Sequence, residues 1–497
     1  MYLYKYIMNN IEKQNLNLAS KLEPKSVFTY FAHLCNIPHP SGHNKQISDY
    51  LVSVLKPVAE TITVYSNHTV LARIKATKGC EKKTSVCLQA HCDMVPAKGY
   101  SSKHNFEKDP IQIVQKKGFL YANDTTLGAD NGIGVAYALA IATDKKIKHG
   151  PLEILITTNE ETNMQGAKEF PARTLKSKYL INLDNEETDT CCLGCNGGTQ
   201  IEFTTKFTRK ADKNLNSYLT ISLEHGAGGH SGNQIRWKIV NAIKMMFSLF
   251  KFVQEKANVA LVDINAGHVS NAISSECVAT IALNKKDVKI ATKILNDMFA
   301  LIKKEFFQRE ANMIMTIKSA KPKYLPISLK DSNSIIDAIN CSFNGVYSLD
   351  ENYKIANGSS NLGIIETQQG FIRSTYLLRS AFEVCKRRIR SQLISAFYGT
   401  KTTHKITDDY PEWTPVIGNS VLQAKYSKIF KKFFNKNLTF SVTEGGLETG
   451  VLTKKHPGME AISIGPDIVA CHSNTEHVDI KGVGLIYKVL LETLKNI

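Results

Sequence analysis

The sequence predicts an α/β protein with helices on both faces of its sheet and a second, α+β domain inserted into the first. Three observations lead to this prediction. Apolar strand-like segments alternate with helical ones up to residue 198. From residue 199, polar and apolar residues alternate. After residue 411, the pattern of strand-like and helical segments returns. Alternating strands and helices are typical of a helix-covered sheet, whereas polar–apolar alternation is typical of antiparallel strands.

The length of the chain also requires more than one domain. It has 497 residues, whereas a single hydrophobic core stops growing at roughly 250–300 residues. We expect an N-terminal extension over residues 1–22, a main domain in two parts over 23–198 and 411–497, and the inserted domain over 199–410.

The N-terminal part of the main domain predicts helices followed by alternating strands and helices. Helical periodicity over Val27–Leu55 is broken by Ile37-Pro38-His39-Pro40-Ser41-Gly42, which indicates a turn between two helices. Short apolar and β-branched runs then indicate strands, with a helix after the third. These elements are Ile62–Tyr65, Val70–Ile74, Ser85–Ala90, the helix Asn131–Thr143, and the strands Leu152–Thr158 and Tyr179–Leu183.

The inserted domain and the C-terminal part follow from the same patterns. Alternating residues predict strands, and apolar residues at helical spacing predict helices. For the insertion these are the strands Gln200–Thr208, Tyr218–Glu224, Val278–Leu283 and Met313–Ser319, and the helices Ile239–Phe252 and Lys289–Glu305. After it come the helix Ser420–Phe434, the strand Ala461–Ile464 and the helix Gly482–Leu494.

Charge and composition narrow the expected partners and location. The net charge is +17, but the basic residues are scattered, and the tightest cluster lies at Lys386, Arg387, Arg388 and Arg390. No nucleic-acid-binding motif accompanies them, so we expect no nucleic-acid partner. No apolar run of about 20 residues indicates a membrane span. Eleven scattered cysteines and an N-terminus without a signal-peptide pattern favour reduced thiols in the cytoplasm.

Seven acidic and imidazole side chains share one sequence context, because each follows a predicted strand or opens a predicted helix. In an open α/β sheet the carboxyl ends of the strands meet at one crevice, so residues nearly 400 positions apart can converge there. The seven candidates are His91, Asp93, Asp130, Glu160, Glu161, Asp184 and His472.

This residue set suits two divalent metal ions. Imidazole nitrogen and carboxylate oxygen are ligands of Zn²⁺ and related ions, and one carboxylate must bridge a pair of ions about 3.5–4 Å apart. We assign the bridge to Asp130. His91 and Asp184 then complete one site, and Glu161 and His472 complete the other.

Two candidates remain outside the ligand set. Glu160 adjoins a ligand, so we expect it to act as the general base that takes a proton from the bridging water. Asp93 lies two residues after His91 and can accept the second ring N–H of that histidine. Taken singly, these residues have simpler explanations, since an Asp at a helix start is commonly an N-cap. Their recurrence after successive apolar strands favours the metal interpretation.

Motifs around these residues resemble those of the M20 metallopeptidases, and most closely those of the bacterial aminoacyl-histidine dipeptidases (Xaa-His dipeptidases of the peptidase D type). The resemblance runs from about Lys21 to the C-terminus, and the segment from Thr126 to Gly134 is highly specific. The other matching segments are Ile37–Gly42, Ala90–Pro96, Thr157–Glu161, Leu183-Asp184, Gly194–Gly198, Gly228–Gly232, Tyr410-Pro411, Ser463–Pro466 and His472-Ser473.

The resemblance implies an activity and a domain arrangement. The main domain would be the catalytic domain, and the insertion a lid and dimerisation domain of a homodimer. Two ions, Zn²⁺ or alternatively Mn²⁺ or Co²⁺, would serve hydrolysis of the peptide bond of small Xaa-His-type dipeptides. In the inserted domain, His230 and Arg379 match residues that imply contact with the substrate.

The sequence departs from the family pattern at positions expected to affect substrate choice. Arg236 and Ile239 stand where the family has a histidine and an arginine, and Ser274-Ser275 replaces Pro-Arg. Glu444 replaces a histidine in Glu444-Gly445-Gly446-Leu447-Glu448. We therefore expect a preference that differs from the usual Xaa-His dipeptides. A related M20 deacylase or aminopeptidase, or a binding protein with weak catalysis, remain alternatives.

Overall fold

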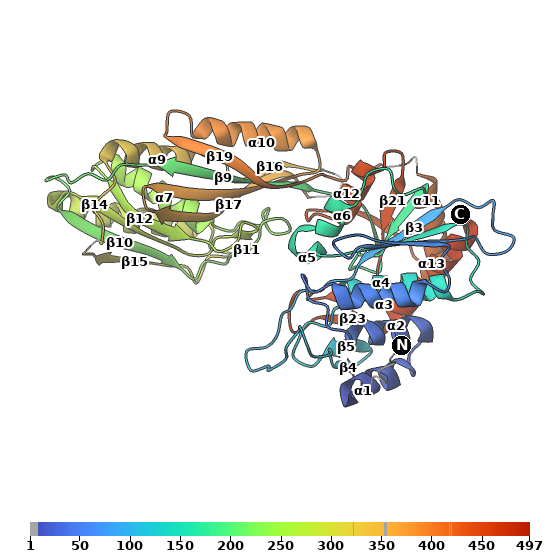
Figure 1. The fold of residues 1–497 in the computed structure, drawn as a ribbon. Helices are drawn as coiled ribbons and strands as arrows, with labels where there is room; N and C mark the ends of the chain where they lie inside the picture. The colour runs from blue at the N-terminus through green and yellow to red at the C-terminus, as the bar shows by residue number, and fades with distance from the viewer. Residues whose placement is uncertain (1–7, 322, 352–354, 417, 419) are drawn as a thin grey trace. The chain divides into compact units, whose positions relative to one another are not determined.

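The chain folds into two compact units. The structure is a computed structural model that describes residues 8–321, 323–351, 355–416, 418 and 420–497 (Figure 1). Unit 1 comprises Met1–Gly194, Pro415–Ser441 and Leu447–Ile497, and unit 2 comprises Cys195–Thr414 and Val442–Gly446. The second unit is therefore inserted into the first. The short segment Val442–Gly446 also groups with the insertion, which the sequence did not indicate.

Unit 1 is built on an eight-stranded sheet with the order β1-β2-β6-β3-β7-β21-β8-β20. Its central strands β6, β3, β7 and β21 run parallel, so their carboxyl ends lie at one edge of the sheet. In sheet order the strands are β1 Thr61–Val64, β2 Val70–Ile74, β6 Leu152–Thr157, β3 Val86–His91, β7 Tyr179–Asn182, β21 Glu460–Ser463, β8 Thr190–Cys195 and β20 Thr439–Thr443.

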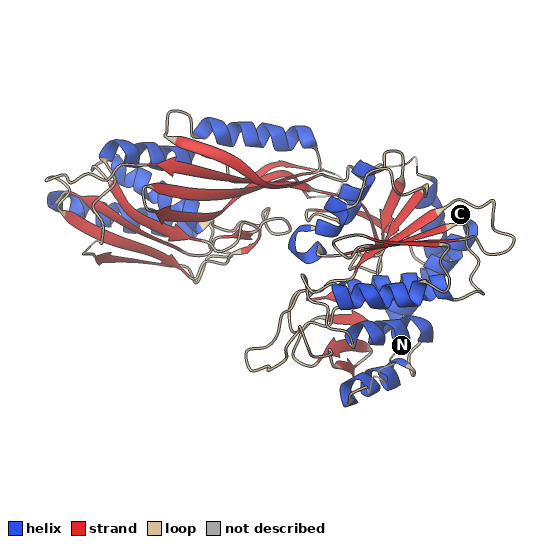
Figure 2. Ribbon diagram, viewed as in Figure 1, coloured by secondary structure: helices blue, strands red, loops and turns tan. Residues whose placement is uncertain are grey.

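Helices and a small second sheet complete unit 1 (Figure 2). The helices are α1 Asn10–Ala19, α2 Lys25–Cys35, α3 Lys45–Leu55, α4 Ala129–Thr143, α5 Glu160–Asn163, α6 Gln165–Glu169, α11 Val421–Phe434, α12 Glu448–Lys455 and α13 Ile480–Asn496. The small sheet, which the sequence did not predict, has the order β22-β23-β5-β4. Its strands are β4 Ile113–Lys116, β5 Phe119–Ala122, β22 Ile468–Val469 and β23 His477–Asp479.

The two faces of the large sheet differ in character. On one face, alternate residues such as Leu88 and Ala90 of β3 join a continuous apolar core with α2, α4, α11 and α13. Successive side chains of a strand point to opposite faces, so Gln89 and His91 lie on the other face. There Gln89 contacts Glu448 of α12. The central strands are therefore buried on both sides, and the second face of β3 carries polar groups up to its carboxyl end.

Unit 2 is built on a nine-stranded antiparallel sheet with the order β15-β10-β14-β12-β17-β18-β9-β19, and β16 pairs with β17. Its elements are β9 Gly197–Lys206, β10 Ser217–Glu224, β11 Gly229–His230, α7 Ala242–Gln254, β12 Ala260–Ala266, β13 Ala272–Ile273, β14 Cys277–Leu283, the 3₁₀ turn Lys285–Asp287, α8 Val288–Glu305, β15 Ile314–Ser319, α9 Leu329–Cys341, β16 Gly345–Leu349, β17 Ala356–Gln368, β18 Phe371–Ser380, α10 Glu383–Ala396 and β19 Thr402–Tyr410.

One apolar core in unit 2 joins inward-facing residues of this sheet to helices α7 to α10. The predicted strands and helices up to Ser319 are present, with ends shifted by a few residues. The long hairpin β17–β18 had no sequence prediction. Its first strand begins with a polar run in which Ser359, Ser360 and Asn361 are buried, and a polar run does not indicate a buried strand.

None of the helices in the described part of the chain is both long enough and apolar enough to cross a lipid bilayer.

We predict that Lys244 stabilises unit 2 by capping the C-terminus of α9. Its ammonium group donates to the main-chain oxygens of Asn340 at 2.9 Å and Ser342 at 2.7 Å, and also to that of Ile339. The substitution Lys244→Met leaves these carbonyl groups without their cation, so we expect a loss of about 1–3 kcal/mol in the free energy of unfolding. Urea unfolding followed by circular dichroism measures the change.

Lys251 supplies a matched control for this measurement. It also lies on α7 and reaches toward α9, but it forms an exposed ion pair with Asp337 at 2.5 Å. Exposed pairs contribute about 0–1 kcal/mol, so Lys251→Met is expected to change stability little. Equal losses in the two variants would contradict the assigned role of Lys244.

Candidate metal centre

Six of the seven predicted residues lie where strands of unit 1 end or helices begin, and the seventh lies in a loop. His91 is the last residue of β3, and Asp93 follows it. Glu160 and Glu161 open α5 directly after β6, and Asp184 follows β7. Asp130 lies in the first turn of α4, and His472 lies in the loop between β22 and β23.

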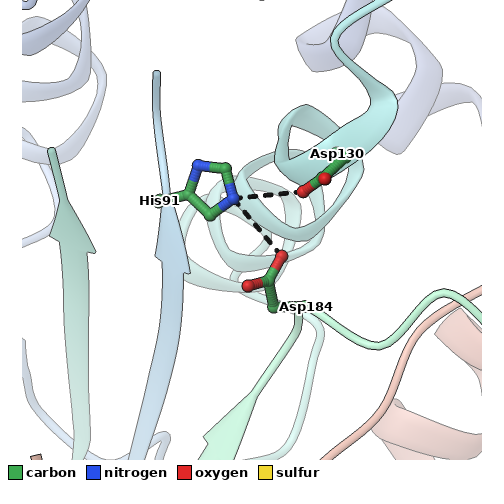
Figure 3. Close-up of side chains that lie close together, drawn as sticks. All are labelled: His91, Asp130 and Asp184. Atoms are coloured by element: carbon green, nitrogen blue, oxygen red, sulfur yellow. Dashed lines mark hydrogen bonds and ion pairs between the residues drawn. The ribbon is translucent and has the colours of Figure 1, made fainter. Parts of the chain in front are cut away.

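His91 joins two of the carboxylates. Its Nε2 atom lies 3.1 Å from Oδ1 of Asp130 and 3.4 Å from Oδ1 of Asp184. Figure 3 shows the imidazole turned toward both carboxylates, which come from α4 and from the loop after β7. The donor atoms of the three residues lie within 4.8 Å of one another, close enough to surround one metal ion.

His472 joins the second pair of carboxylates. Its Nε2 atom lies 3.4 Å from Oδ2 of Asp130 and 2.8 Å from Oε2 of Glu161. The three residues form a second group that could hold a metal ion. Asp130 thus presents one oxygen to His91 and the other to His472. This is the arrangement required of a carboxylate that bridges two ions.

The electrostatics of the cluster show an excess of negative charge. Burial raises the pKa values of Glu160 and Asp184, and neighbouring carboxylates raise them further. Burial and the charge of Asp130 raise the pKa of Glu161 to about 7. Hydrogen bonds to Asp130 and Glu161 raise the pKa of His472 to about 11.

The donor set fits divalent cations. Cations placed among these carboxylates would relieve their mutual repulsion. Within the described residues, Oε1 of Glu161 is buried and accepts no hydrogen bond. A bound cation would supply the partner that this oxygen lacks. Imidazole and carboxylate groups together suit Zn²⁺ and similar ions.

The Asp93 side chain lies beside the second ring nitrogen of His91 and also contacts other groups. The nearest partner of His91 Nδ1 is the main-chain oxygen of Asp93 at 3.0 Å, and the carboxylate oxygen Oδ1 lies 3.5 Å away. The carboxylate also accepts hydrogen bonds from the Ser41 hydroxyl at 2.7 Å and from the N–H of Glu160 at 3.0 Å. Asp93 therefore connects the end of β3 to the start of α5.

Glu476, which the sequence analysis missed, holds the loop that carries Asp130. Its buried carboxylate accepts four main-chain N–H bonds, from Leu127 at 2.6 Å, Gly128 at 2.9 Å, Ala129 at 2.8 Å and Asp130 at 3.2 Å. The only signal in the sequence is an acidic residue four positions after His472, and many exposed loops have the same pattern.

Glu186 and Cys471 were also missed. With Asp130 they form another group whose donor atoms lie within 4.8 Å of one another. Both oxygens of Asp130 already face the two histidines. Glu186 and Cys471 therefore lie at the margin of the centre.

His230 and Arg379, the two predicted substrate residues, both lie in unit 2. Arg379 of β18 is buried and donates to the Tyr410 hydroxyl at 2.9 Å, and its Nε atom has no partner in the described part of the chain. Nδ1 of His230 accepts from the N–H of Gly232 at 3.3 Å. Their approach to the metal cluster of unit 1 stays a prediction.

Two departures from the family pattern contact each other in unit 2. Nε of Arg236 lies 3.7 Å from Oε1 of Glu444, which also accepts the N–H of Ala356 at 2.5 Å. The main-chain oxygen of Glu444 accepts from Arg379 at 3.5 Å. The replacement of a histidine by Glu444 is thus accompanied by a cation, and the pair lies beside one of the predicted substrate residues.

Comparison with known families decides the classification. The profile of peptidase family M20/M25/M40 matches residues 87–496, which is most of the chain. The chain belongs to this family. The resemblance inferred from the motifs is therefore confirmed, and the groups around His91 and His472 lie within the matched residues 87–496.

Individual relatives cover nearly the whole chain. It is 34% identical over 484 residues to the cytosol non-specific dipeptidase of Escherichia coli (strain K12), covering 96% of this chain and 99% of that protein. The crystal structure of aminoacylhistidine dipeptidase from Vibrio alginolyticus matches with a TM-score of 0.85 and 30% identity, covering 96% of this chain and 98% of that one. Aminopeptidase PepT from Bacillus cereus, with a TM-score of 0.56, 12% identity and coverage of 95% and 98%, shares the fold.

We predict that Glu161 destabilises the metal-free protein as the pH rises. Its pKa of about 7 in the folded chain lies above the unfolded value of about 4.3. The stability from this group is therefore present below the unfolded value and is lost as the pH rises through the folded one. Metal-free Glu161→Gln should gain about 1–3 kcal/mol relative to the metal-free parent between pH about 5 and 8.

Denaturant unfolding in the presence of a chelator, at several pH values, measures this difference. Comparing the variant with its parent cancels the titration of buried groups that do not contact Glu161, whereas His472, which is hydrogen-bonded to Glu161, titrates differently in the two proteins. With metal added the order should reverse, because the ion stabilises only the protein that retains its ligand. A difference independent of pH would show that Glu161 carries no unfavourable charge in the folded protein.

Proposed function

We propose that the chain is a two-metal dipeptidase that hydrolyses the peptide bond of small peptides. One observation carries the proposal: the carboxylate of Asp130 is shared between His91 and His472, each of which also meets a second carboxylate. The two relatives that cover the chain at 30% identity or more are both named as dipeptidases, which favours dipeptides as the substrate class.

Each ligand has a defined place in this proposal. His91, Asp130 and Asp184 hold one divalent ion, and Asp130, Glu161 and His472 hold the other. When bound, the ions supply Lewis-acid activation of a water molecule and of the scissile carbonyl. We assign zinc as the native metal, with manganese or cobalt as alternatives, because the mixed imidazole–carboxylate set suits these ions.

Glu160 moves the proton in the proposed reaction. It takes a proton from the attacking water and gives it to the amine nitrogen that leaves when the peptide C–N bond breaks. Its main-chain N–H is held at 3.0 Å by Asp93. Burial raises the pKa of its carboxyl, which favours a group that both accepts and returns a proton. Asp93 fixes the position of this base and of His91.

Unit 2 takes the role of lid in the proposal. His230 would stabilise the developing oxyanion, and Arg379 would bind the substrate carboxylate through its planar guanidinium group. We further propose that the chain forms a homodimer through this unit and acts in the cytoplasm. The Escherichia coli relative is named as a cytosol dipeptidase, which supports this location.

We predict that Glu160→Ala keeps both metal ions but loses most turnover. Removal of the proton carrier should lower kcat by about 10²–10⁴-fold, because positioned acid–base groups contribute about that much. Atomic emission measures the metal content, and kcat is measured on the same sample with a dipeptide that the parent protein hydrolyses. Glu169→Ala is the control, since Glu169 is an exposed carboxylate on the neighbouring helix α6. Loss of a metal ion from Glu160→Ala would show that this residue is a ligand.

We also predict a substrate preference different from that for Xaa-His dipeptides. Glu444 and Arg236 place charges beside Arg379 where the family pattern has a histidine at each position, so the recognition of the substrate is expected to change. A panel of Xaa-His, β-alanyl and other dipeptides, tripeptides and N-acylated amino acids, assayed for kcat/KM with Zn²⁺, Mn²⁺ or Co²⁺, gives the profile.

The panel also separates the alternative functions. A preference for N-acylated amino acids would indicate a deacylase, and a preference for tripeptides would indicate an aminopeptidase. Unchanged Xaa-His preference would contradict the predicted effect of the substitutions. Absence of turnover with every metal would favour a binding protein over the proposed enzyme.

A further inference from the structure

A row of polar side chains crosses the central strands of the large sheet of unit 1. It lies two or three residues before the metal ligands and the general base in the sequence. Its members are Thr157 of β6, Gln89 of β3, Asn182 of β7 and Ser463 of β21, and all four are fully buried. The sheet register places Gln89 opposite Asn182, and Asn182 opposite Ser463. Interior positions of a parallel sheet normally carry apolar residues, so a polar row needs a specific partner for each group.

The row forms one continuous chain of hydrogen bonds. The Ser463 hydroxyl donates to Oδ1 of Asn182, and Nδ2 of Asn182 donates to Oε1 of Gln89 at 2.6 Å. Nε2 of Gln89 then donates to Oε2 of Glu448 at 2.7 Å and to the Thr157 hydroxyl at 3.2 Å. The Thr157 hydroxyl also donates to Oε2 of Glu448. One oxygen of Glu448 therefore accepts both terminal donors of the chain.

The members of the row lie next to the proposed catalytic residues. Gln89 precedes His91 by two residues, Asn182 precedes Asp184 by two, and Thr157 precedes Glu160 by three. The main-chain N–H of Asp184 also donates to Oδ1 of Asn182 at 3.3 Å. A shift of any strand in the row would therefore move a ligand or the general base.

Glu448 supplies the carboxyl group at the end of this row and comes from a distant part of the chain. It is the first residue of α12, is fully buried, and follows Gln89 by 359 positions. We propose that Glu448 is a positioning residue that fixes the ends of β3, β6 and β7 and so sets the spacing of the two metal sites. This inference rests on the proposed two-metal function.

The test compares Glu448→Ala with Glu448→Gln. A glutamine oxygen can accept the same two hydrogen bonds, whereas alanine leaves Gln89 and Thr157 without their acceptor. Outer partners of metal ligands typically change metal affinity or activity by about 10–100-fold when they are removed. We therefore expect Glu448→Ala to bind Zn²⁺ about 10–100-fold more weakly, and Glu448→Gln to stay close to the parent.

Metal affinity is measured by competition with a chromophoric chelator, below the onset of thermal unfolding. kcat and KM are measured at saturating metal, and a fall in kcat with unchanged KM is expected, because the side chains of the row are fully buried. Thr157→Val removes one donor to Glu448 and one acceptor of Gln89, leaves the bond from Gln89 to Glu448, and is expected to weaken metal binding in the same direction. It keeps the test decisive even where the alanine variant does not fold.

Glu153 provides the matched control. It is a buried carboxylate on the same strand β6 and accepts from Arg73 at 3.0 Å and from the N–H groups of Lys176 and Ser177 at 2.9 Å, away from the metal ligands. Glu153→Ala should lower the unfolding temperature but leave metal affinity unchanged.

The outcomes distinguish the inference from the proposed function. A parent protein that binds no metal pair would overturn both. A parent that binds two ions, with Glu448→Ala and Thr157→Val binding them equally well, would overturn only the role of Glu448. Weakening by Glu153→Ala equal to that by Glu448→Ala would also overturn it, because general destabilisation would then explain the loss.

Discussion

The carboxylate of Asp130, shared between two histidines, is the interaction on which the rest of the centre depends. One of its oxygens faces His91 and the other faces His472, and each histidine also meets another carboxylate. The raised pKa values of the surrounding acids show that such a group is unfavourable without cations. The same crowding that destabilises the metal-free protein would make the metal-bound protein stable, because the two ions supply the missing positive charge.

Holding these side chains in place requires a rigid surrounding. The parallel strands bring the ligands to one edge, but their spacing is set by hydrogen bonds behind them. Asp93 joins the end of β3 to the start of α5, Glu476 holds the loop before Asp130, and Glu448 ends the polar row beneath. Three buried carboxylates that accept N–H or O–H groups thus surround a centre made of further carboxylates, and each satisfies donors that burial would otherwise leave unpaired.

The proposed metal ligands and general base could be predicted because the residues next to them in the sequence indicate their positions. A single acidic residue or histidine after an apolar strand has simpler structural explanations, but its repetition at His91, Glu160–Glu161 and Asp184 pointed to one crevice. Glu448 and Glu476 carry no such signal, because each resembles an ordinary acidic residue near a helix or in a loop. Their roles depend on contacts with Gln89 and with the loop at Leu127, hundreds of positions away.

The sequence by itself determined the α/β class with its insertion, the family, and the residues proposed to bind metal, since periodicity and motifs are local properties of the chain. Only the tertiary structure decided that Asp130 divides its oxygens between His91 and His472, that the Asp93 carboxylate supports α5 more closely than it supports His91, and that Arg236 accompanies Glu444. These facts depend on distances between distant segments. Such distances follow from tertiary packing, which cannot be predicted from a local pattern of residues.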